Sequence, residues 1–365
     1  MTPLTALLAQ RIEADGPMSL ADYMAECLLH PRYGYYATRD PFGRAGDFIT
    51  APEISQMFGE LVGLWLTDMW IRAGREEPVH YIELGPGRGT LAQDALRTAR
   101  RYGLEPSVHF VESSTALKDI QLVTVPGAQW HYDLSTTPPY GPVLIVANEF
   151  LDALPVRQLV MTENGWRERM VIAEGERFAC VAGPQPMDAA VPEARRAAPV
   201  GTILETCPGA AATVYEVAGR LIEQGGAALF IDYGHDELRD GSTLQAVRDH
   251  LKVDPFINPG EADLTASYGD TRANSAGYDL SNEQVLDQLG ERLHQSENQP
   301  WQAAPALGSE LRLVFTPGTS TAIAQLHDGT TATANGTSAA VTGGSEYHVF
   351  TLDIDARCWC STRPR

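Results

Sequence analysis

The chain has 365 residues, enough for one large or two modest domains, and its 44% of apolar residues is ordinary for a globular protein with a buried core. The net charge of -20 argues against binding to nucleic acid, which depends on Lys and Arg, and suits either a basic macromolecular partner or simple solubility. Five scattered cysteines without a C-x-x-C pair predict neither a disulfide framework nor a zinc site.

The first 75 residues are predicted to be mainly helical. Apolar residues recur at helical spacing from Leu4 to Ile12, and Ser19 is placed to cap a second helix that Pro31 closes. The N-terminus lacks the basic region of a signal peptide, and no apolar stretch approaches the length of a membrane span. These features predict no membrane insertion and, by default, a cytoplasmic protein.

A loop is predicted from residue 30 to 46, because HPRYGYYATRDPFGRAG holds three tyrosines, three glycines and two prolines with little periodicity. Such loops either contact ligands or pack on their own side chains, and both readings stay open. A helix is expected from Pro52 to about Trp70. The candidate substrate residues of this region are Tyr33, Tyr35, Asp47, Phe48, Thr50 and Glu53.

The stretch YIELGPGRGTL, residues 81 to 91, combines a strand end, a carboxylate and three glycines at alternate positions. A strand followed by a glycine turn and a helix brings backbone close to a ligand at the carboxyl edge of a parallel sheet. The third glycine comes one residue too early for the dinucleotide fingerprint, and Glu83 suits a cation better than a pyrophosphate. The pattern resembles motif I of class I methyltransferases, which bind S-adenosylmethionine. The candidate cofactor residues of the loop are Glu83, Gly85, Gly87 and Gly89, and a turn that serves packing alone is the alternative.

After this loop the pattern alternates strand and helix, which predicts a doubly wound, mostly parallel sheet. Strands are expected near residues 108–112, 130–133, 143–147 and 227–232. Glu112, at the end of its strand, is placed to accept hydrogen bonds from ribose hydroxyls. Asp133, after a weak strand, is a candidate acceptor for the adenine amino group.

The loop after the fourth strand, ANEFLDALP, carries the candidate catalytic residues Asn148, Glu149 and Asp152. A guanidinium stays protonated far above neutral pH, so a site that methylates it needs carboxylates to pair with it and to take its proton. Two nearby carboxylates meet both needs. In the alternative, Asp152 caps the following turn and only Glu149 faces the ligand.

Several ordered motifs together resemble the MidA family: GDFITAPEIS, ELGPGRGTL, VESS, ANEFLDALPV, ETCPGA, GGAALFIDYG, and STLQAVRDH followed by NPGEADLTA. The resemblance covers roughly residues 10 to 265. It implies a Rossmann-like class I methyltransferase fold with a helical cap, S-adenosyl-L-methionine as cofactor, and an arginine of a respiratory complex I subunit as acceptor. Because the chain lacks an Arg- and Ser-rich transit peptide, a bacterial, cytoplasmic member is expected.

Three regions are expected on this basis: a helical cap at residues 1–75, a methyltransferase core at 76–265 and an atypical segment at 266–365. The family pattern stops after Thr265, and residues 316 to 345 hold 16 Ser, Thr or Gly in 30. Either the tail has diverged or the reading frame of the gene has shifted, and we hypothesise the second. Strands at 311–315 and 347–354 and a helix at 283–295 are the elements expected there.

Three other functions stay open at this stage. They are an assembly chaperone that binds the cofactor without catalysis, a small-molecule methyltransferase, and a dinucleotide oxidoreductase, which the glycine spacing disfavours. The oligomeric state is open as well, with a dimer as one option.

Overall fold

The computed structural model describes residues 2–38, 50–232, 234–235, 240–266, 268–269, 321–325, 331–335 and 348–352. Contacts divide the chain into two units. The first comprises Met1–Phe48, Glu149–Tyr215 and Asp232–Asp287, and the second comprises Ile49–Asn148, Glu216–Ile231 and Gln288–Arg365. This grouping differs from the division at residues 75 and 265, which stays a prediction. The difference arises because the N-terminal helices pack on segments that follow much later in the chain.

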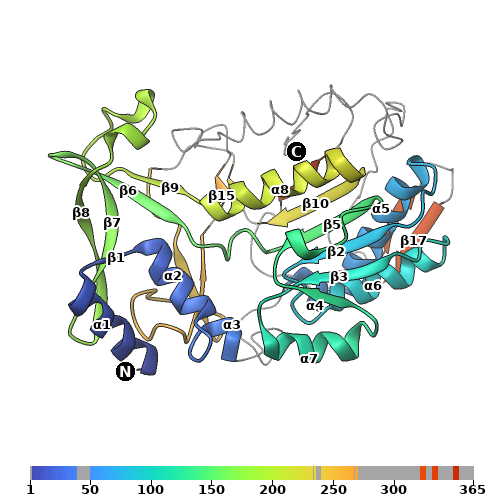
Figure 1. Ribbon diagram of the computed structural model, residues 1–365, viewed down its shortest axis with the longest axis horizontal. Coiled ribbons are helices and arrows are strands. Elements are labelled where there is room, and N and C mark those ends of the chain that lie inside the picture. Colours follow the sequence, from blue (N-terminus) through green and yellow to red (C-terminus); the bar gives the residue numbers. More distant parts are fainter. Residues whose placement is uncertain are drawn as a thin grey trace. The chain divides into compact units, whose positions relative to one another are not determined.

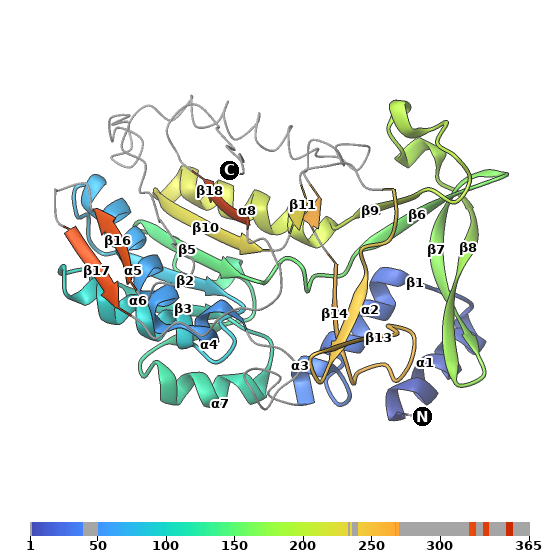
Figure 2. The same cartoon turned by 180° about the vertical axis from the view of Figure 1, so that it is seen from behind.

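The second unit is built on a parallel sheet in the order β4-β3-β2-β5-β10 (Figure 1), with β18 beside β10 (Figure 2). Its strands are β2 (His80–Leu84), β3 (Ser107–Val111), β4 (Gln129–His131), β5 (Val143–Asn148), β10 (Gly226–Asp232) and β18 (His348–Leu352). Chain order reverses between β2 and β5, the point where open α/β sheets bind ligands. The predicted α/β fold with a doubly wound sheet is thus confirmed.

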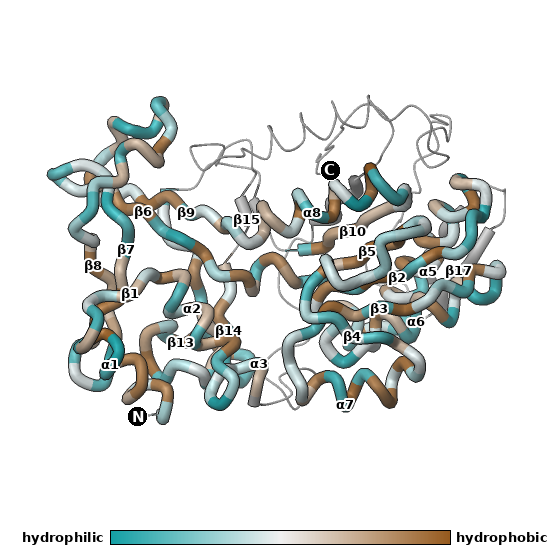
Figure 3. The backbone as a smooth tube through the Cα atoms, in the orientation of Figure 1, coloured by the Kyte–Doolittle hydropathy of each residue, from teal (hydrophilic) through white to brown (hydrophobic). Residues whose placement is uncertain are grey.

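The central strands β5 and β10 are apolar runs buried on both faces, as parallel strands covered by helices usually are. Every residue of β2 and β10 is buried, and apolar residues concentrate along these strands in Figure 3. Three helices of the second unit, α5 (Gln56–Arg72), α6 (Thr90–Arg100) and α7 (Thr115–Thr124), surround them together with α8 (Pro208–Gln224), of which residues 208–215 belong to the first unit and the rest to the second. Helices α5 and α6 cross closely, since a Cβ on Gly63 would lie 2.3 Å from the carbonyl oxygen of Ala95.

The helix predicted from Pro52 to Trp70 is interrupted. A short α4 (Ala51–Ile54) ends before Ser55, which is extended at φ -149°, and α5 starts at Gln56. The Ser55 hydroxyl accepts a hydrogen bond from the Met57 amide at 3.2 Å and so caps the second helix. The serine favours a new start over continuation of the first helix.

The first unit combines helices with an antiparallel sheet that the sequence analysis missed. Its helices are α1 (Pro3–Asp15), α2 (Leu20–Leu29) and α3 (Tyr35–Thr38), and the N-terminal cap of α2 at Ser19 is as predicted. The sheet runs β1-β7-β6-β9, and β8 pairs with β7. These strands are β1 (Met18–Ser19), β6 (Arg157–Thr162), β7 (Gly165–Glu174), β8 (Arg177–Pro186) and β9 (Ile203–Thr206).

A second, three-stranded sheet of the first unit packs on the N-terminal helices. It contains β12 (Gln245–Arg248), β13 (Leu251–Val253) and β14 (Asp263–Thr265), and β14 lies against α2 (Figure 2). The short remaining elements are β11 (Gly234–His235), β15 (Tyr268–Gly269), β16 (Thr321–Gln325), β17 (Thr331–Asn335), η1 (Leu134–Thr136), η2 (Asp188–Ala190) and η3 (Glu193–Arg195).

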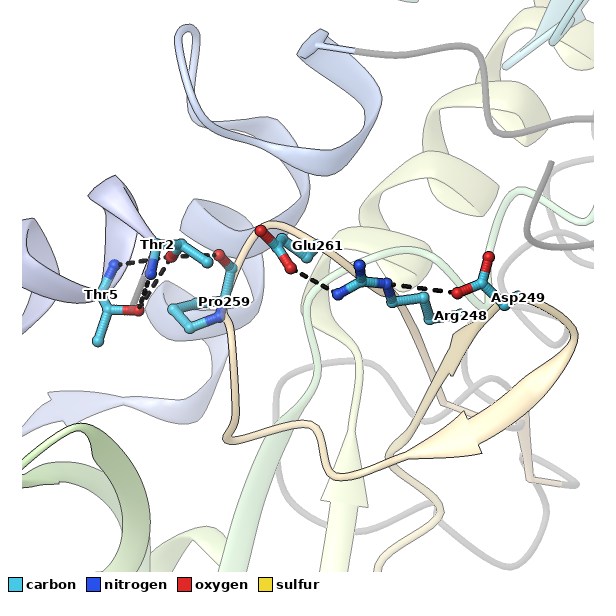
Figure 4. Close-up of polar contacts among 6 residues, drawn as sticks. All are labelled: Thr2, Thr5, Arg248, Asp249, Pro259 and Glu261. Atoms are coloured by element: carbon cyan, nitrogen blue, oxygen red, sulfur yellow. Dashed lines mark hydrogen bonds and ion pairs between the residues drawn. The ribbon is translucent and has the colours of Figure 1, made fainter.

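The start of α1 is tied to the loop before β14 (Figure 4). Thr2 and Thr5 form a reciprocal capping box, and the Thr2 hydroxyl also donates to the Pro259 carbonyl at 3.0 Å. In the same loop Glu261 accepts a hydrogen bond from the Arg248 guanidinium at 2.5 Å. These contacts explain why the N-terminal helices belong to the same unit as residues near 260.

A chain of histidines crosses one face of the parallel sheet. His109 Nδ1 lies 2.9 Å from His131 Nε2, and the Ser107 hydroxyl lies 3.2 Å from His109 Nε2 and 2.6 Å from His80 Nδ1. Burial, then the neighbouring His131, His80 and Arg220, lowers the pKa of His109 to about 4. The folded chain therefore holds this imidazole neutral at pH values where the unfolded chain would protonate it.

We expect these hydrogen-bonded histidines to make the folded protein less stable in acid. The unfolded state takes up a proton near pH 6.5 and the folded state only near pH 4, so the free energy of unfolding falls as pH drops through that window. His109→Gln should reduce the loss between pH 7 and pH 5 by ~1–2 kcal/mol, less than the full pKa difference implies because the window between the two pKa values extends below pH 5. Urea unfolding at both pH values measures it, with the exposed His250→Asn as control. Equal pH dependence in the native protein and His109→Gln would contradict the expectation.

Within the residues that the structure describes, no helix is both long and apolar enough to cross a membrane. Strand β18 falls inside the strand predicted at 347–354. The predicted strand at 311–315 and helix at 283–295 lie outside the described residues, and the hypothesis of a shifted reading frame stays a prediction.

Candidate active site

The glycine loop leaves β2 in a tight turn that only glycine adopts easily. Gly85, Gly87 and Gly89 have φ values of 62°, 55° and 80°, in the left-handed region. The Gly85 amide donates to the Val111 carbonyl at 3.0 Å, and α6 begins directly after Gly89. The predicted succession of strand, glycine turn and helix is thus present.

Glu83 is a buried carboxyl directly before this loop. It is 2% exposed and accepts a hydrogen bond from the Tyr81 hydroxyl at 2.7 Å. Burial raises the pKa of Glu83 to about 8, and the Tyr81 bond lowers it only in part. The unliganded protein therefore keeps this group mostly protonated near neutral pH, and a cation beside it would favour ionisation.

Glu112 follows β3 and is held from two sides. One carboxylate oxygen accepts from the Ser114 amide at 2.7 Å, and the other accepts from the Gln121 side chain at 3.0 Å. Burial raises the pKa of Glu112, while these bonds lower it. Asp133 follows β4, is exposed, and accepts from the Ser135 hydroxyl at 2.6 Å. The two predicted acceptors thus lie at the ends of neighbouring strands.

Two of the predicted substrate residues, Thr50 and Glu53, lie in the second unit, and Glu53 contacts residues at the glycine loop. Glu53 accepts a hydrogen bond from the Thr90 hydroxyl at 2.6 Å and pairs with Arg88 at 3.4 Å. Thr50 is 7% exposed and precedes α4 as its N-cap residue. The structure therefore places Glu53 where it orders the loop, and a substrate contact for either residue stays a prediction.

The candidate catalytic residues begin at the end of β5. Asn148 is the last residue of the strand, and Glu149 has φ 49°, a left-handed conformation uncommon for a residue with a side chain. Asp152 is 7% exposed, and its backbone carbonyl accepts from the Ala266 amide at 2.9 Å. Side chains held in such uncommon backbone conformations cluster at functional sites.

Three carboxylates of the first unit act on a fourth, Asp152. Burial raises the pKa of Asp152 well above its usual range, and the charges of Asp232, Asp263 and Glu149 raise it further. We call these four residues the carboxylate cluster. Asp232 accepts from the Leu151 amide at 2.7 Å, and Asp263 accepts from the Tyr36 hydroxyl at 2.7 Å. Such a cluster is unfavourable while empty and favours a cation with several donors.

The tyrosines of the predicted substrate loop have different positions. Tyr35 is fully buried in the core of the first unit, while Tyr36 reaches the carboxylate cluster through Asp263. Tyr33 stacks on His30 with ring centroids 5.1 Å apart. The structure thus favours Tyr36 over Tyr35 as a group near a ligand. Asp47 and Phe48, the other predicted substrate residues, lie outside the described residues.

Sequence reasoning did not single out Asp263 as a site residue, whereas it placed Tyr36 with Tyr33 and Tyr35 along a substrate channel. Both stood in stretches that it had marked, the NPGEADLTA motif and the aromatic loop. The contact that joins them spans 227 residues of chain. The available signal was that Asp263 is a carboxylate in a motif to which no role had been assigned.

Comparison with known proteins identifies the family. A family model described as "Putative S-adenosyl-L-methionine-dependent methyltransferase" matches residues 61–278, more than half of the chain. The chain belongs to this methyltransferase family. Its cofactor is accordingly S-adenosylmethionine, and the predicted cofactor and enzyme class are confirmed.

The relatives of this methyltransferase agree with that assignment. The mouse and human proteins named "Protein arginine methyltransferase NDUFAF7, mitochondrial" are each 37% identical over 300 residues, which cover 73% of this chain and 67% of theirs. A crystal structure of a superfamily member from Burkholderia thailandensis bound to S-adenosyl-homocysteine is 28% identical, with a TM-score of 0.62, and covers 74% of both chains.

The predicted cytoplasmic location is wrong. It followed only from the apparent lack of a targeting segment, which carries no positive information about location. The curated relatives of this methyltransferase are named mitochondrial proteins.

Proposed function

We propose that the protein transfers a methyl group from S-adenosylmethionine to a guanidinium nitrogen of arginine in a protein partner. The carboxylate cluster of the first unit supports this most strongly, because Asp232 accepts hydrogen bonds from the Leu151 and Asp152 amides and Asp263 accepts one from the Tyr36 hydroxyl. When bound, the cofactor supplies an electrophilic methyl group on a sulfonium. The residues of the chain then have two tasks, which are to hold the cofactor and to hold and deprotonate the acceptor.

The glycine loop and two carboxyls fit the cofactor side of this proposal. Gly85, Gly87 and Gly89 leave backbone free to approach a ligand closely, because a Cβ would not fit their conformations. Glu83 offers a negative charge to a cationic ligand, and Glu112 offers acceptors to ribose hydroxyls. Asp133 is proposed to accept from the adenine amino group.

Carboxylates fit the acceptor side for a reason of charge. A guanidinium stays protonated and presents five N–H donors in one plane, which carboxylates match. As the methyl group leaves sulfur for nitrogen, the nitrogen must lose a proton. A carboxylate whose pKa is raised by its surroundings, and which the bound guanidinium keeps ionised, accepts that proton well. We assign Glu149 and Asp152 to this work, with Asn148 orienting the guanidinium through its side-chain carbonyl.

A metal ion is the main competitor as the occupant of an acidic cluster. Among the described residues, no group of three or more His, Cys, Asp or Glu is arranged to hold one. We propose an organic cation as the occupant instead. The relatives named protein arginine methyltransferase support arginine as that cation. Following the MidA resemblance, we propose a respiratory complex I subunit as the partner.

Three peptides that differ in one residue test the acceptor assignment. Purified protein with labelled cofactor is offered a peptide that contains arginine, the same peptide with lysine, and the same peptide with citrulline, the neutral isostere. We expect label on the arginine peptide alone, because only arginine combines positive charge with a planar set of donors. Equal labelling of the lysine peptide, or label confined to small molecules, would contradict the proposal.

Glu83 should make cofactor binding depend on pH. Its pKa of about 8 falls when a cation binds, so binding releases a proton and affinity rises with pH up to about 8, by up to about tenfold per unit. Glu83→Gln should bind more weakly and release fewer protons. Calorimetry with S-adenosylmethionine, in buffers of different ionisation enthalpy, measures both. The same proton release in native protein and Glu83→Gln would show that Glu83 does not respond to the cofactor.

A further inference from the structure

Gln121 of α7 joins three parts of the cofactor side of the second unit. Its amide nitrogen donates to the Gly87 carbonyl at 2.6 Å and to Glu112 at 3.0 Å, and its oxygen accepts from the Trp130 indole at 2.8 Å. The side chain is fully buried. One residue thus contacts the glycine loop, the end of β3 and strand β4.

The three bonds define the orientation of this amide. An indole N–H can only donate, so the oxygen of Gln121 must face Trp130 and the nitrogen must face Gly87 and Glu112. Both N–H groups and the oxygen are then engaged. Gln121 is the donor in its hydrogen bonds to both Glu112 and Gly87. A donor facing Glu112 favours the ionised carboxylate, which can only accept hydrogen bonds.

We infer that Gln121 is a positioning residue for the ribose of the cofactor, acting through Glu112. The Ser114 amide holds one oxygen of Glu112 and Gln121 holds the other, so the pair sets the plane of the carboxylate. A backbone hydrogen bond from Ser113 takes a further lone pair, and those that remain are available to the ribose hydroxyls. The bond to the Gly87 carbonyl links this orientation to the glycine loop. The inference rests on the proposed role of Glu112.

The affinities of two ligands test this role without a measurement of catalysis. The ligands are S-adenosyl-homocysteine and its 2′-deoxy analogue, and their ratio of dissociation constants reports how strongly the ribose hydroxyl is recognised. Gln121→Met, which keeps the shape but no hydrogen bond, should reduce that preference by about 10- to 100-fold, the range for bonds to a charged group. A general loss of packing would weaken both ligands equally and leave the ratio unchanged.

Gln93→Met is the matched control. Gln93 lies on α6, is exposed, and donates to the Thr124 carbonyl at the end of α7 at 3.0 Å, so it anchors the same helix without touching Glu112. We expect the native ligand preference in this variant. Should Gln121→Met fold poorly, Gln121→Glu keeps the acceptor for Trp130 and places a carboxylate beside Glu112, and it should lose the preference too.

The variant Glu112→Gln distinguishes the proposed role of Glu112 from that of Gln121. If this variant keeps the ribose preference, the proposed role of Glu112 fails, and the inference falls with it. If it loses the preference while folded Gln121→Met or Gln121→Glu keeps it, the role of Gln121 alone is overturned. If Gln121 acts through Glu112, the double variant Glu112→Gln/Gln121→Met shows the same preference as Glu112→Gln, and a further additive loss would contradict that.

Discussion

Glu149→Gln is expected to lower methyl transfer by about 10²- to 10⁴-fold, the usual contribution of a general base, while the affinity for S-adenosylmethionine stays near that of the native protein. The amide keeps the size of the side chain but neither pairs with a guanidinium nor takes its proton. Glu149 also has a left-handed backbone conformation directly after β5, of the kind that clusters at functional sites. Single-turnover transfer and calorimetry on the same preparation separate the two effects.

The exposed Glu163, in the turn between β6 and β7, provides the control for this substitution. Glu163→Gln makes the same chemical change in the same unit, away from the carboxylate cluster, and should leave transfer unchanged. Full activity of Glu149→Gln would remove Glu149 from the mechanism. Loss of cofactor affinity in Glu149→Gln would contradict the proposal that separate residues hold the cofactor and the acceptor.

Asp152→Asn should lower the rate of methyl transfer but raise the stability of the fold at alkaline pH. Its carboxyl is raised in pKa by burial and by like charges, so the folded state binds its proton more tightly than the unfolded state. The free energy of unfolding therefore falls as pH rises from the unfolded pKa toward the folded one. Asparagine avoids this loss, so the variant should melt at a higher temperature than the native protein at alkaline pH while it transfers methyl groups more slowly.

Gly87→Val is expected to abolish detectable binding of S-adenosyl-homocysteine, a loss of at least about 10²-fold. A β-branched residue is strongly disfavoured at φ 55°, and the turn would change to relieve the strain. The same peptide supplies the carbonyl that Gln121 holds at 2.6 Å. A displaced Gly87 therefore disturbs both the loop and the proposed ribose site.

Gly103→Val controls for backbone strain in the same unit. Gly103 has φ 87°, and a Cβ there meets nothing within 4 Å, so the variant carries similar strain after α6 without touching the glycine loop. It should keep its affinity for S-adenosyl-homocysteine. Gly87→Val also separates an enzyme from an assembly chaperone. If cells that carry it assemble the partner complex normally, the cofactor serves no essential catalysis.

The second unit could be predicted because its signals are local. Glu83 and the three glycines lie within seven residues, and the apolar runs of β5 and β10 specify strands buried on both faces. The break at Ser55 escaped prediction, since the same residue type also occurs inside helices. The hydrogen bond from the Met57 amide to the Ser55 hydroxyl decides where the second helix begins. Hydrophobic periodicity carries no information about that bond.

The first unit was harder to predict because its contacts span long stretches of chain. Two tight turns, at residues 163–164 and 175–176, connect β6 to β7 and β7 to β8, and the Gly residues beside or within them were signals that went unused. The carboxylate cluster depends on Asp263, which is 111 positions after Asp152. Pairings of this kind are set by tertiary packing, which no local pattern encodes.

The measurement that tests the central claim most directly is the transfer of a deuterated methyl group to protein. Extract from cells that lack this protein is incubated with the purified protein and labelled S-adenosylmethionine, and labelled residues are located by tandem mass spectrometry. We predict label on arginine of a protein acceptor, and none when Glu149→Gln replaces the native protein. Label on lysine or on small molecules alone, or no label from protein that binds the cofactor, would contradict the account.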